Sequence, residues 1–118
     1  MAITTTYYSR GPGVALNGST TPATAAQAQG LMKQSALIAF GVTGDAQATF
    51  THNWGFGLSA AAEREPEILV DLVSTALTTY TPLLTFDRSN TNAVLVNKTG
   101  GDACTVVITL RRPHSLGQ

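Results

Sequence analysis

The sequence predicts an all-β protein, a compact antiparallel β-sandwich or small barrel preceded by an extended N-terminal arm. Three observations predict it. Apolar residues alternate with polar ones from residue 35 onward, turn-forming segments separate these runs at spacings of about 10 residues, and the first 30 residues keep neither the helical nor the strand period for long. On folding, a chain of 118 residues buries enough surface to form one hydrophobic core. We therefore expect an arm over residues 1–34 and one β-domain over residues 35–118.

The expected arm is rich in Thr, Ala, Gly, Ser and Gln, with Arg10 and Lys33 as its charged residues. Such a segment buries too little apolar surface to order by itself. Disordered tails in solvent usually carry many charges, and this segment carries few, so we expect it to order on a neighbouring subunit. The alternative is a disordered terminus. Asn17-Gly18 is typical of a tight hairpin turn. The candidate partner-binding residues of the arm are Tyr7, Tyr8, Arg10, Val14 and Leu16.

Two strands are expected at residues 36–42 and 46–54. The turn-forming run Thr43-Gly44-Asp45 lies between them, so we predict that they pair as an antiparallel hairpin. One face of each strand is apolar: Ala36, Ile38, Phe40 and Val42 in the first, and Ala46, Ala48, Phe50, His52 and Trp54 in the second.

The segment from Ser59 to Leu77 fits two structures. Residues 66–77 place apolar side chains on one helical face, yet Ile68, Val70 and Leu72 also alternate as a strand. Because the neighbouring segments favour strands, we expect a short helix near residues 59–65, a break at Pro66 and a strand over residues 67–73.

Three further strands complete the expected domain. They lie at residues 81–88, 93–98 and 103–110, and the segments between them, residues 89–92 and 99–102, have turn-forming composition.

The run around His52 and Trp54 attracts two chemical interpretations, a general base and a stacking platform. Both residues share a strand face with Phe50, so we expect them to pack at the rim of the core, with the imidazole hydrogen-bonded to a neighbour. Cys104 alternates with apolar residues and is expected to be a small buried hydrophobe.

Charged residues concentrate in the second half of the chain. The acidic cluster Glu63, Glu65, Glu67 and Asp71 matches no calcium loop and is expected to be a solvated surface. Arg111 and Arg112 point to opposite faces of the last strand; they either blunt an edge strand or pair with carboxylates of another subunit, which makes them candidate partner-binding residues.

Composition argues against several classes of function. A net charge of zero disfavours a nucleic-acid partner. The chain has no apolar run of membrane-spanning length and no signal-peptide pattern, so we expect a soluble protein made in the cytoplasm, without a membrane partner. No motif indicates an enzyme, a metal or a cofactor.

The low-charge arm ahead of a β-domain, with the runs Phe50-Thr51-His52-Asn53-Trp54-Gly55 and Asn92-Ala93-Val94-Leu95-Val96, resembles small bacteriophage virion proteins, above all capsid decoration (cement) proteins. The resemblance implies a structural protein made in the host cytoplasm and located on the capsid surface. It implies the major capsid protein and further copies of the chain, as a homotrimer, as partners.

Two other functions remain open at this point. A tail or fibre module that binds carbohydrate would need Trp54, Phe56 and Tyr80 on one exposed surface as stacking residues. A small enzyme would need His52 beside an acidic partner.

Overall fold

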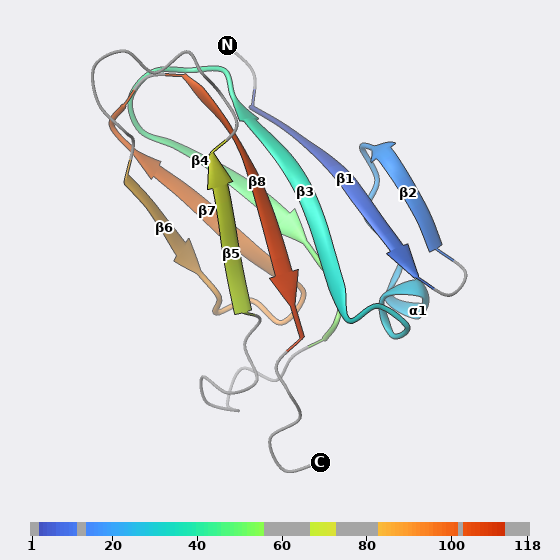
Figure 1. Cartoon of the computed structure of the whole chain (residues 1–118). Coiled ribbons are helices and arrows are strands. Elements are labelled where there is room, and N and C mark those ends of the chain that lie inside the picture. Colours follow the sequence, from blue (N-terminus) through green and yellow to red (C-terminus); the bar gives the residue numbers. More distant parts are fainter. Residues whose placement is uncertain (1–2, 12–13, 56–66, 73–82, 102, 113–118) are drawn as a thin grey trace.

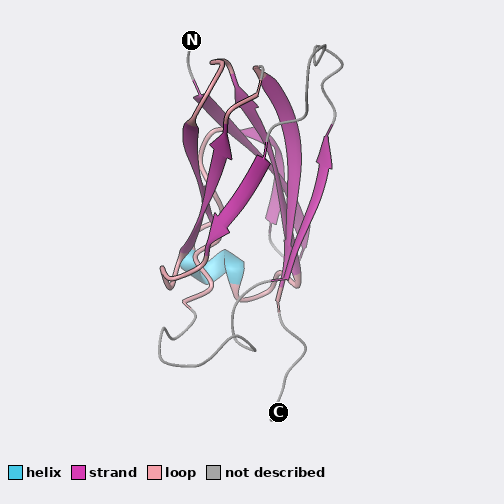
Figure 2. Ribbon diagram, turned by 90° about the vertical axis from the view of Figure 1, so that its left-hand side faces the viewer, coloured by secondary structure: helices cyan, strands magenta, loops and turns pink. Residues whose placement is uncertain are grey.

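A computed structural model of the chain describes residues 3–11, 14–55, 67–72, 83–101 and 103–112, which form two antiparallel sheets packed face to face (Figures 1 and 2). One sheet has five strands in the order β2-β1-β3-β8-β5, and the other has three in the order β4-β7-β6. The predicted all-β class is confirmed, and the arrangement is a sandwich without a closed barrel among the described strands. The bounds are β1 Ile3–Gly11, β2 Val14–Ser19, α1 Ala25–Ala28, β3 Lys33–Phe40, β4 Ala46–Thr51, β5 Glu67–Leu72, β6 Leu83–Asp87, β7 Ala93–Thr99 and β8 Cys104–Arg111.

The core lies between the sheets and comes from the alternation seen in the sequence. Buried and half-buried residues alternate along β3 and β8, which pair so that Ala36 faces Ile108 and Ile38 faces Val106. From the other sheet, β4 contributes Phe50, which is fully buried. Full burial of such a side chain stabilises the fold by about 1.5–3 kcal/mol.

The described residues of the segment 1–34 are not an arm outside the domain, in contrast to the prediction. β1 pairs with β3 from Ile3 opposite Phe40 to Tyr8 opposite Ser35, and β2 lies outside β1 (Figure 1). The Tyr7 ring meets Phe50 edge-on, with centroids 5.6 Å apart. The Thr and Tyr residues of β1 favour strands, and pairing with β3 supplies the order that this polar segment lacks alone.

The pair Asn17-Gly18 lies inside β2 and does not form the predicted turn. The chain reverses between Gly11 and Val14, which are register partners. The β1–β2 register shifts where Tyr7 faces Ser19 and Tyr8 faces Asn17, so Gly18 is the extra residue of a bulge. Its φ of 87° is a left-handed conformation that glycine adopts without steric cost.

The predicted hairpin of β3 and β4 is wrong, because the two strands belong to different sheets. β3 pairs with β1 and β8, whereas β4 pairs with β7. Two strands with one apolar face each can bury those faces side by side or across the core, so alternation does not distinguish the two arrangements. Residues 41–45 therefore cross from one sheet to the other.

A buried lysine holds this crossing in place. Lys98 is 1% exposed, and its Nζ donates hydrogen bonds to the carbonyl oxygens of Gly44, Gly100 and Gly101. The Gly100 amide in turn donates to Asp45 Oδ1 at 2.8 Å. The crossing at residues 41–45 and the turn before β8 are thereby joined through one ammonium group.

The other strand predictions are confirmed by β5, β6, β7 and β8, and β5 excludes the helical alternative over residues 67–72. The short helix expected near residues 59–65 lies outside the described residues. Helix α1 was not predicted. It is a single turn closed by a capping box, in which Thr24 and Gln27 each accept a hydrogen bond from the other's backbone amide. Within the described part of the chain, no helix has the length and apolarity to cross a membrane.

Candidate functional site

His52 and Trp54 follow the last residue of β4 and lie in the interior, at the end of the sandwich where β4 ends. His52 Nδ1 accepts a hydrogen bond from the Trp54 amide at 3.0 Å, and the two rings stack with centroids 5.2 Å apart. Burial lowers the pKa of His52 from 6.5 to about 4, so the imidazole is neutral at pH 7. The predicted packing of both residues at the rim of the core, with a hydrogen-bonded imidazole, is confirmed.

Trp54 does not offer the exposed ring that the carbohydrate interpretation needs. The side chain is 4% exposed, and its Nε1 donates to the carbonyl oxygens of Ala28 and Leu31 at 2.8 and 3.1 Å. The Arg112 guanidinium lies 6.0 Å from the ring centroid. Phe56 and Tyr80, the other two predicted stacking residues, lie outside the described residues.

Cys104 is buried, as predicted, with 3% of its surface exposed. Burial raises the pKa of its thiol, and the charge of Lys98 opposes that rise. The thiol is therefore protonated at neutral pH and poorly suited to nucleophilic attack. Among the described residues, no three His, Cys, Asp or Glu side chains are grouped so that they could hold a metal ion.

The five-stranded sheet has one face toward the core and one toward solvent, and we call the second the outer face. Cross-strand register places side chains on it in rows. One row runs through Tyr8, Ser35, Thr109 and Leu69 on β1, β3, β8 and β5, and the next through Lys33, Arg111 and Glu67. No described helix or strand lies over this face (Figures 1 and 2).

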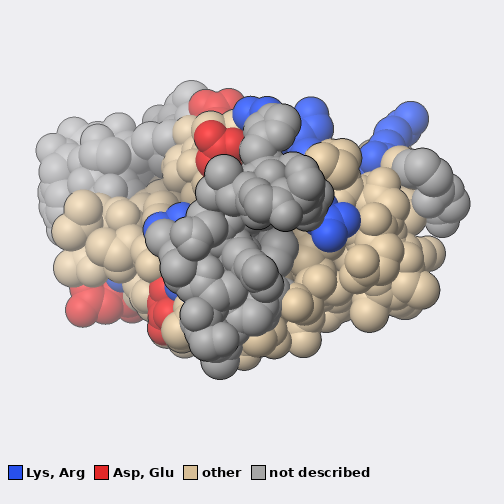
Figure 3. All heavy atoms as spheres, turned by 90° about the horizontal axis from the view of Figure 1, so that it is seen from below, with Lys and Arg blue, Asp and Glu red and all other residues tan. Residues whose placement is uncertain are grey.

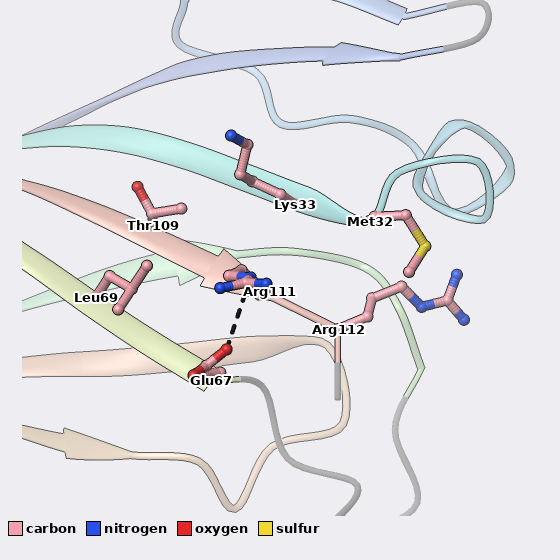
Figure 4. Close-up of a pocket in the computed structure, with 7 residues that line it drawn as sticks. All are labelled: Met32, Lys33, Glu67, Leu69, Thr109, Arg111 and Arg112. Carbon is pink, nitrogen blue, oxygen red and sulfur yellow. Dashed lines mark ion pairs between the residues drawn. The ribbon is translucent and has the colours of Figure 1, made fainter. Parts of the chain in front are cut away.

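Two hollows of the outer face share Lys33. The first, about 500 Å³, is also lined by Met32, Glu67, Leu69, Thr109, Arg111 and Arg112 (Figure 4). The second, about 550 Å³, extends across β1 and β2 and is lined by Tyr8, Arg10, Leu16 and Asn17 among others. Figure 4 shows Arg111 turned toward Glu67, and Lys33 extended away from that pair. Lys33 therefore stands between the two hollows.

Cations gather at one end of this face, where β1 and β8 end and β3 and β5 begin. Arg10, Lys33 and Arg111 are exposed there, and several Lys and Arg side chains lie along one margin of the view from below (Figure 3). Arg111 Nε lies 3.6 Å from Glu67 Oε1, with the two side chains 48% and 59% exposed. An ion pair this exposed contributes little to stability.

The structure brings together most, but not all, of the predicted partner-binding residues. Tyr8, Arg10, Leu16, Arg111 and Arg112 line the two hollows. Tyr7 and Val14 do not, because they point into the core and are 4% and 5% exposed.

Sequence reasoning missed four residues of the first hollow as candidates for partner binding. They are Met32, Lys33, Leu69 and Thr109. For Lys33 and Thr109 the signal is present in the sequence, because both alternate with core residues and must face away from the core. Leu69 likewise alternates with Ile68 and Val70 of the predicted strand, whereas for Met32 we find no such signal.

Arg111 and Arg112 point to opposite sides of β8, as predicted. Arg111 lies on the outer face beside Glu67, whereas Arg112 lies over Trp54 and donates from Nη1 to the carbonyl oxygen of Gln29 at 3.1 Å. They do not blunt an edge, because β8 pairs with both β3 and β5. In the acidic cluster, Glu67 and Asp71 are exposed as expected, and Glu63 and Glu65 lie outside the described residues.

The outer face offers groups that suit a binding surface. It offers cations, hydroxyl groups and apolar side chains, and the neutral His52 and the protonated Cys104 both lie in the interior. No family model, no curated protein and no solved structure matches this chain.

Proposed function

We propose that this protein is a structural component of a bacteriophage virion that binds the outside of the capsid and stabilises it through contacts between subunits. The proposal rests on the resemblance to capsid decoration proteins together with one structural observation. That observation is the outer face of the five-stranded sheet, a solvent-facing surface that no described helix or strand covers.

The composition of the outer face supports a binding role. Large apolar side chains stay exposed on it, with Tyr8 43% and Leu69 46% exposed, and Met32 at its end 66% exposed. Between them lie half-buried residues such as Leu37 and Val107. Apolar surface left beside polar residues typically marks a protein interaction site. A virion subunit that functions while covered by its neighbours needs such a surface for its contacts with them.

The proposed partners are the major capsid protein and further copies of this chain, arranged as a trimer by analogy with decoration proteins. The edge strands support self-association, because β5 and β6 each pair with a single described strand. Exposed strand edges are a template for pairing with another chain.

The test uses purified capsids that lack this protein. The added protein is expected to sediment with the capsids up to a saturating ratio, to raise the temperature at which they disassemble, and to bind monomeric shell protein much more weakly than capsids. Sedimentation of the free protein is expected to give a single oligomeric species. A folded, strictly monomeric protein that does not bind capsids would overturn the proposal.

A further inference from the structure

We propose that the outer face binds an extended, acidic segment of polypeptide, which lies across the strands with Lys33 at its centre. The inference rests on the proposed function and deepens it, since the segment belongs to the shell protein. The observations that carry it are the two hollows that share Lys33, the cations that line them, and the apolar side chains on both sides.

The charge arrangement of the outer face favours an anionic partner. Lys33 and Arg111 are register partners on β3 and β8, so two cations lie directly opposite each other. Like charges in this position destabilise a sheet. Glu67 faces Arg111 from the other side, and Arg10 lines the same hollow as Lys33. Glu67 offsets only part of the repulsion between these cations. Carboxylates of a bound segment, placed over this row, offset the rest.

The apolar side chains show that the partner is amphipathic rather than a simple anion. Leu69 and Met32 flank Lys33 on one side, and Tyr8 flanks it on the other. Burial of Met32, Leu69 and Tyr8 by a ligand removes exposed apolar surface from water, which small anions do not do. Acidic residues that alternate with apolar ones fit both features.

The dimensions of the site fit an extended chain. The lining residues run from Leu16 on β2 to Leu69 on β5, across all five strands of the sheet. Neighbouring strands lie about 4.8 Å apart, so this span is about 19 Å, which an extended segment crosses in about six residues.

The same observations disfavour a nucleic acid. Among the described residues that line the hollows, Tyr8 is the one aromatic residue, whereas single-stranded nucleic acids are usually bound by several stacking rings.

The first experiment measures capsid binding by the double variant Arg10→Gln/Lys33→Gln. The matched control is Thr49→Glu/Thr85→Glu, which lowers the net charge by the same amount at exposed positions of β4 and β6 in the other sheet. We expect the first variant to bind capsids at least tenfold more weakly than the wild type, and the control to bind within twofold. Circular dichroism melting checks that both variants are folded.

Three outcomes are distinguishable. If the wild type does not bind capsids, the proposed function fails. If the wild type binds and Arg10→Gln/Lys33→Gln binds equally well, the proposed function stands and the acidic-segment site is overturned. Equal weakening by both variants attributes the effect to net charge and also overturns the site.

The second experiment uses a peptide probe and does not depend on capsids. The intact protein is titrated with a six-residue peptide of alternating Glu and Val, with its Gln–Val counterpart, and with a short oligothymidylate. We expect amide NMR shifts in β1, β3 and β8 with the Glu–Val peptide, weakened by added salt, and at least fivefold weaker binding of the Gln–Val peptide. Tighter binding of the oligothymidylate, or equal binding of both peptides, overturns the proposal.

Discussion

The indole Nε1 of Trp54 donates a hydrogen bond to the carbonyl oxygen of Ala28 at 2.8 Å, which joins the segment after β4 to the last residue of α1. The same Nε1 also reaches the carbonyl oxygen of Leu31 at 3.1 Å. One buried ring thereby holds the segment that leads into β3, and Lys33, which lines both hollows of the outer face, begins that strand.

Trp54→Phe is expected to destabilise the protein by about 2–4 kcal/mol, because it leaves a cavity and removes the donor from two buried carbonyl groups. Urea unfolding followed by far-UV circular dichroism measures the change. A loss below about 0.5 kcal/mol would show that these hydrogen bonds do not hold α1.

Tyr7→Ala and Tyr8→Ala test whether β1 is part of the fold. Tyr7 is 4% exposed and its hydroxyl accepts a hydrogen bond from the Thr51 amide at 3.1 Å, whereas Tyr8 is 43% exposed. We expect Tyr7→Ala to lower the free energy of unfolding by about 3–5 kcal/mol and Tyr8→Ala by less than about 1 kcal/mol. Equal, small effects in urea unfolding would return residues 1–34 to the status of an arm.

Lys98→Met tests the crossing between the sheets. The variant keeps much of the side-chain volume but removes the donor from the carbonyl groups of Gly44, Gly100 and Gly101. We expect a loss of about 2–4 kcal/mol in thermal or urea unfolding. Asp45→Ala, which removes one acceptor at the exposed rim, serves as the comparison with an expected loss of about 1 kcal/mol. A neutral Lys98→Met variant would mean that the crossing does not need the ammonium group.

The free energy of unfolding is expected to decrease as the pH is lowered, because the buried His52 is then forced to take up a proton. The pKa of His52 is lowered from 6.5 to about 4 by burial, so between these values the unfolded chain binds more protons than the folded one. The contribution is complete above pH 6.5 and is lost as pH falls toward 4. It amounts to about 1–3 kcal/mol.

His52→Asn provides the control for this pH dependence, because an Asn side-chain oxygen can still accept the Trp54 amide hydrogen bond but does not titrate. The free energy of unfolding of each protein is measured by urea titration from pH 4 to pH 7.5. The wild type is expected to lose more stability than His52→Asn over this range. Parallel curves would show that His52 is not the group responsible.

Much of the strand content could be predicted from alternation alone, and the partners of those strands could not. β5, β6, β7 and β8 lie where the pattern places them, because a strand with one buried face has a period of two wherever it pairs. β1 was missed as part of the domain because Thr-rich strands bury few large apolar residues, and backbone pairing with β3 holds it in the sheet.

The candidate site was only partly visible in the sequence for a similar reason. The sequence indicates Tyr8, Arg10 and Leu16 only as part of the expected arm, and Arg111 and Arg112 as an expected contact between subunits. Lys33 and Leu69 meet them only because β3 and β5 flank β8.

By itself, the sequence determined the all-β class, the positions of most strands, and the burial of His52, Trp54 and Cys104, because each follows from the local period of side chains along one strand. The tertiary structure alone decided that β3 and β4 belong to opposite sheets, that residues 3–11 form part of the larger sheet, and that Lys33 stands beside Arg111. These relationships join residues far apart in the chain, and the pairing of backbone edges that creates them leaves no periodic signal in either strand.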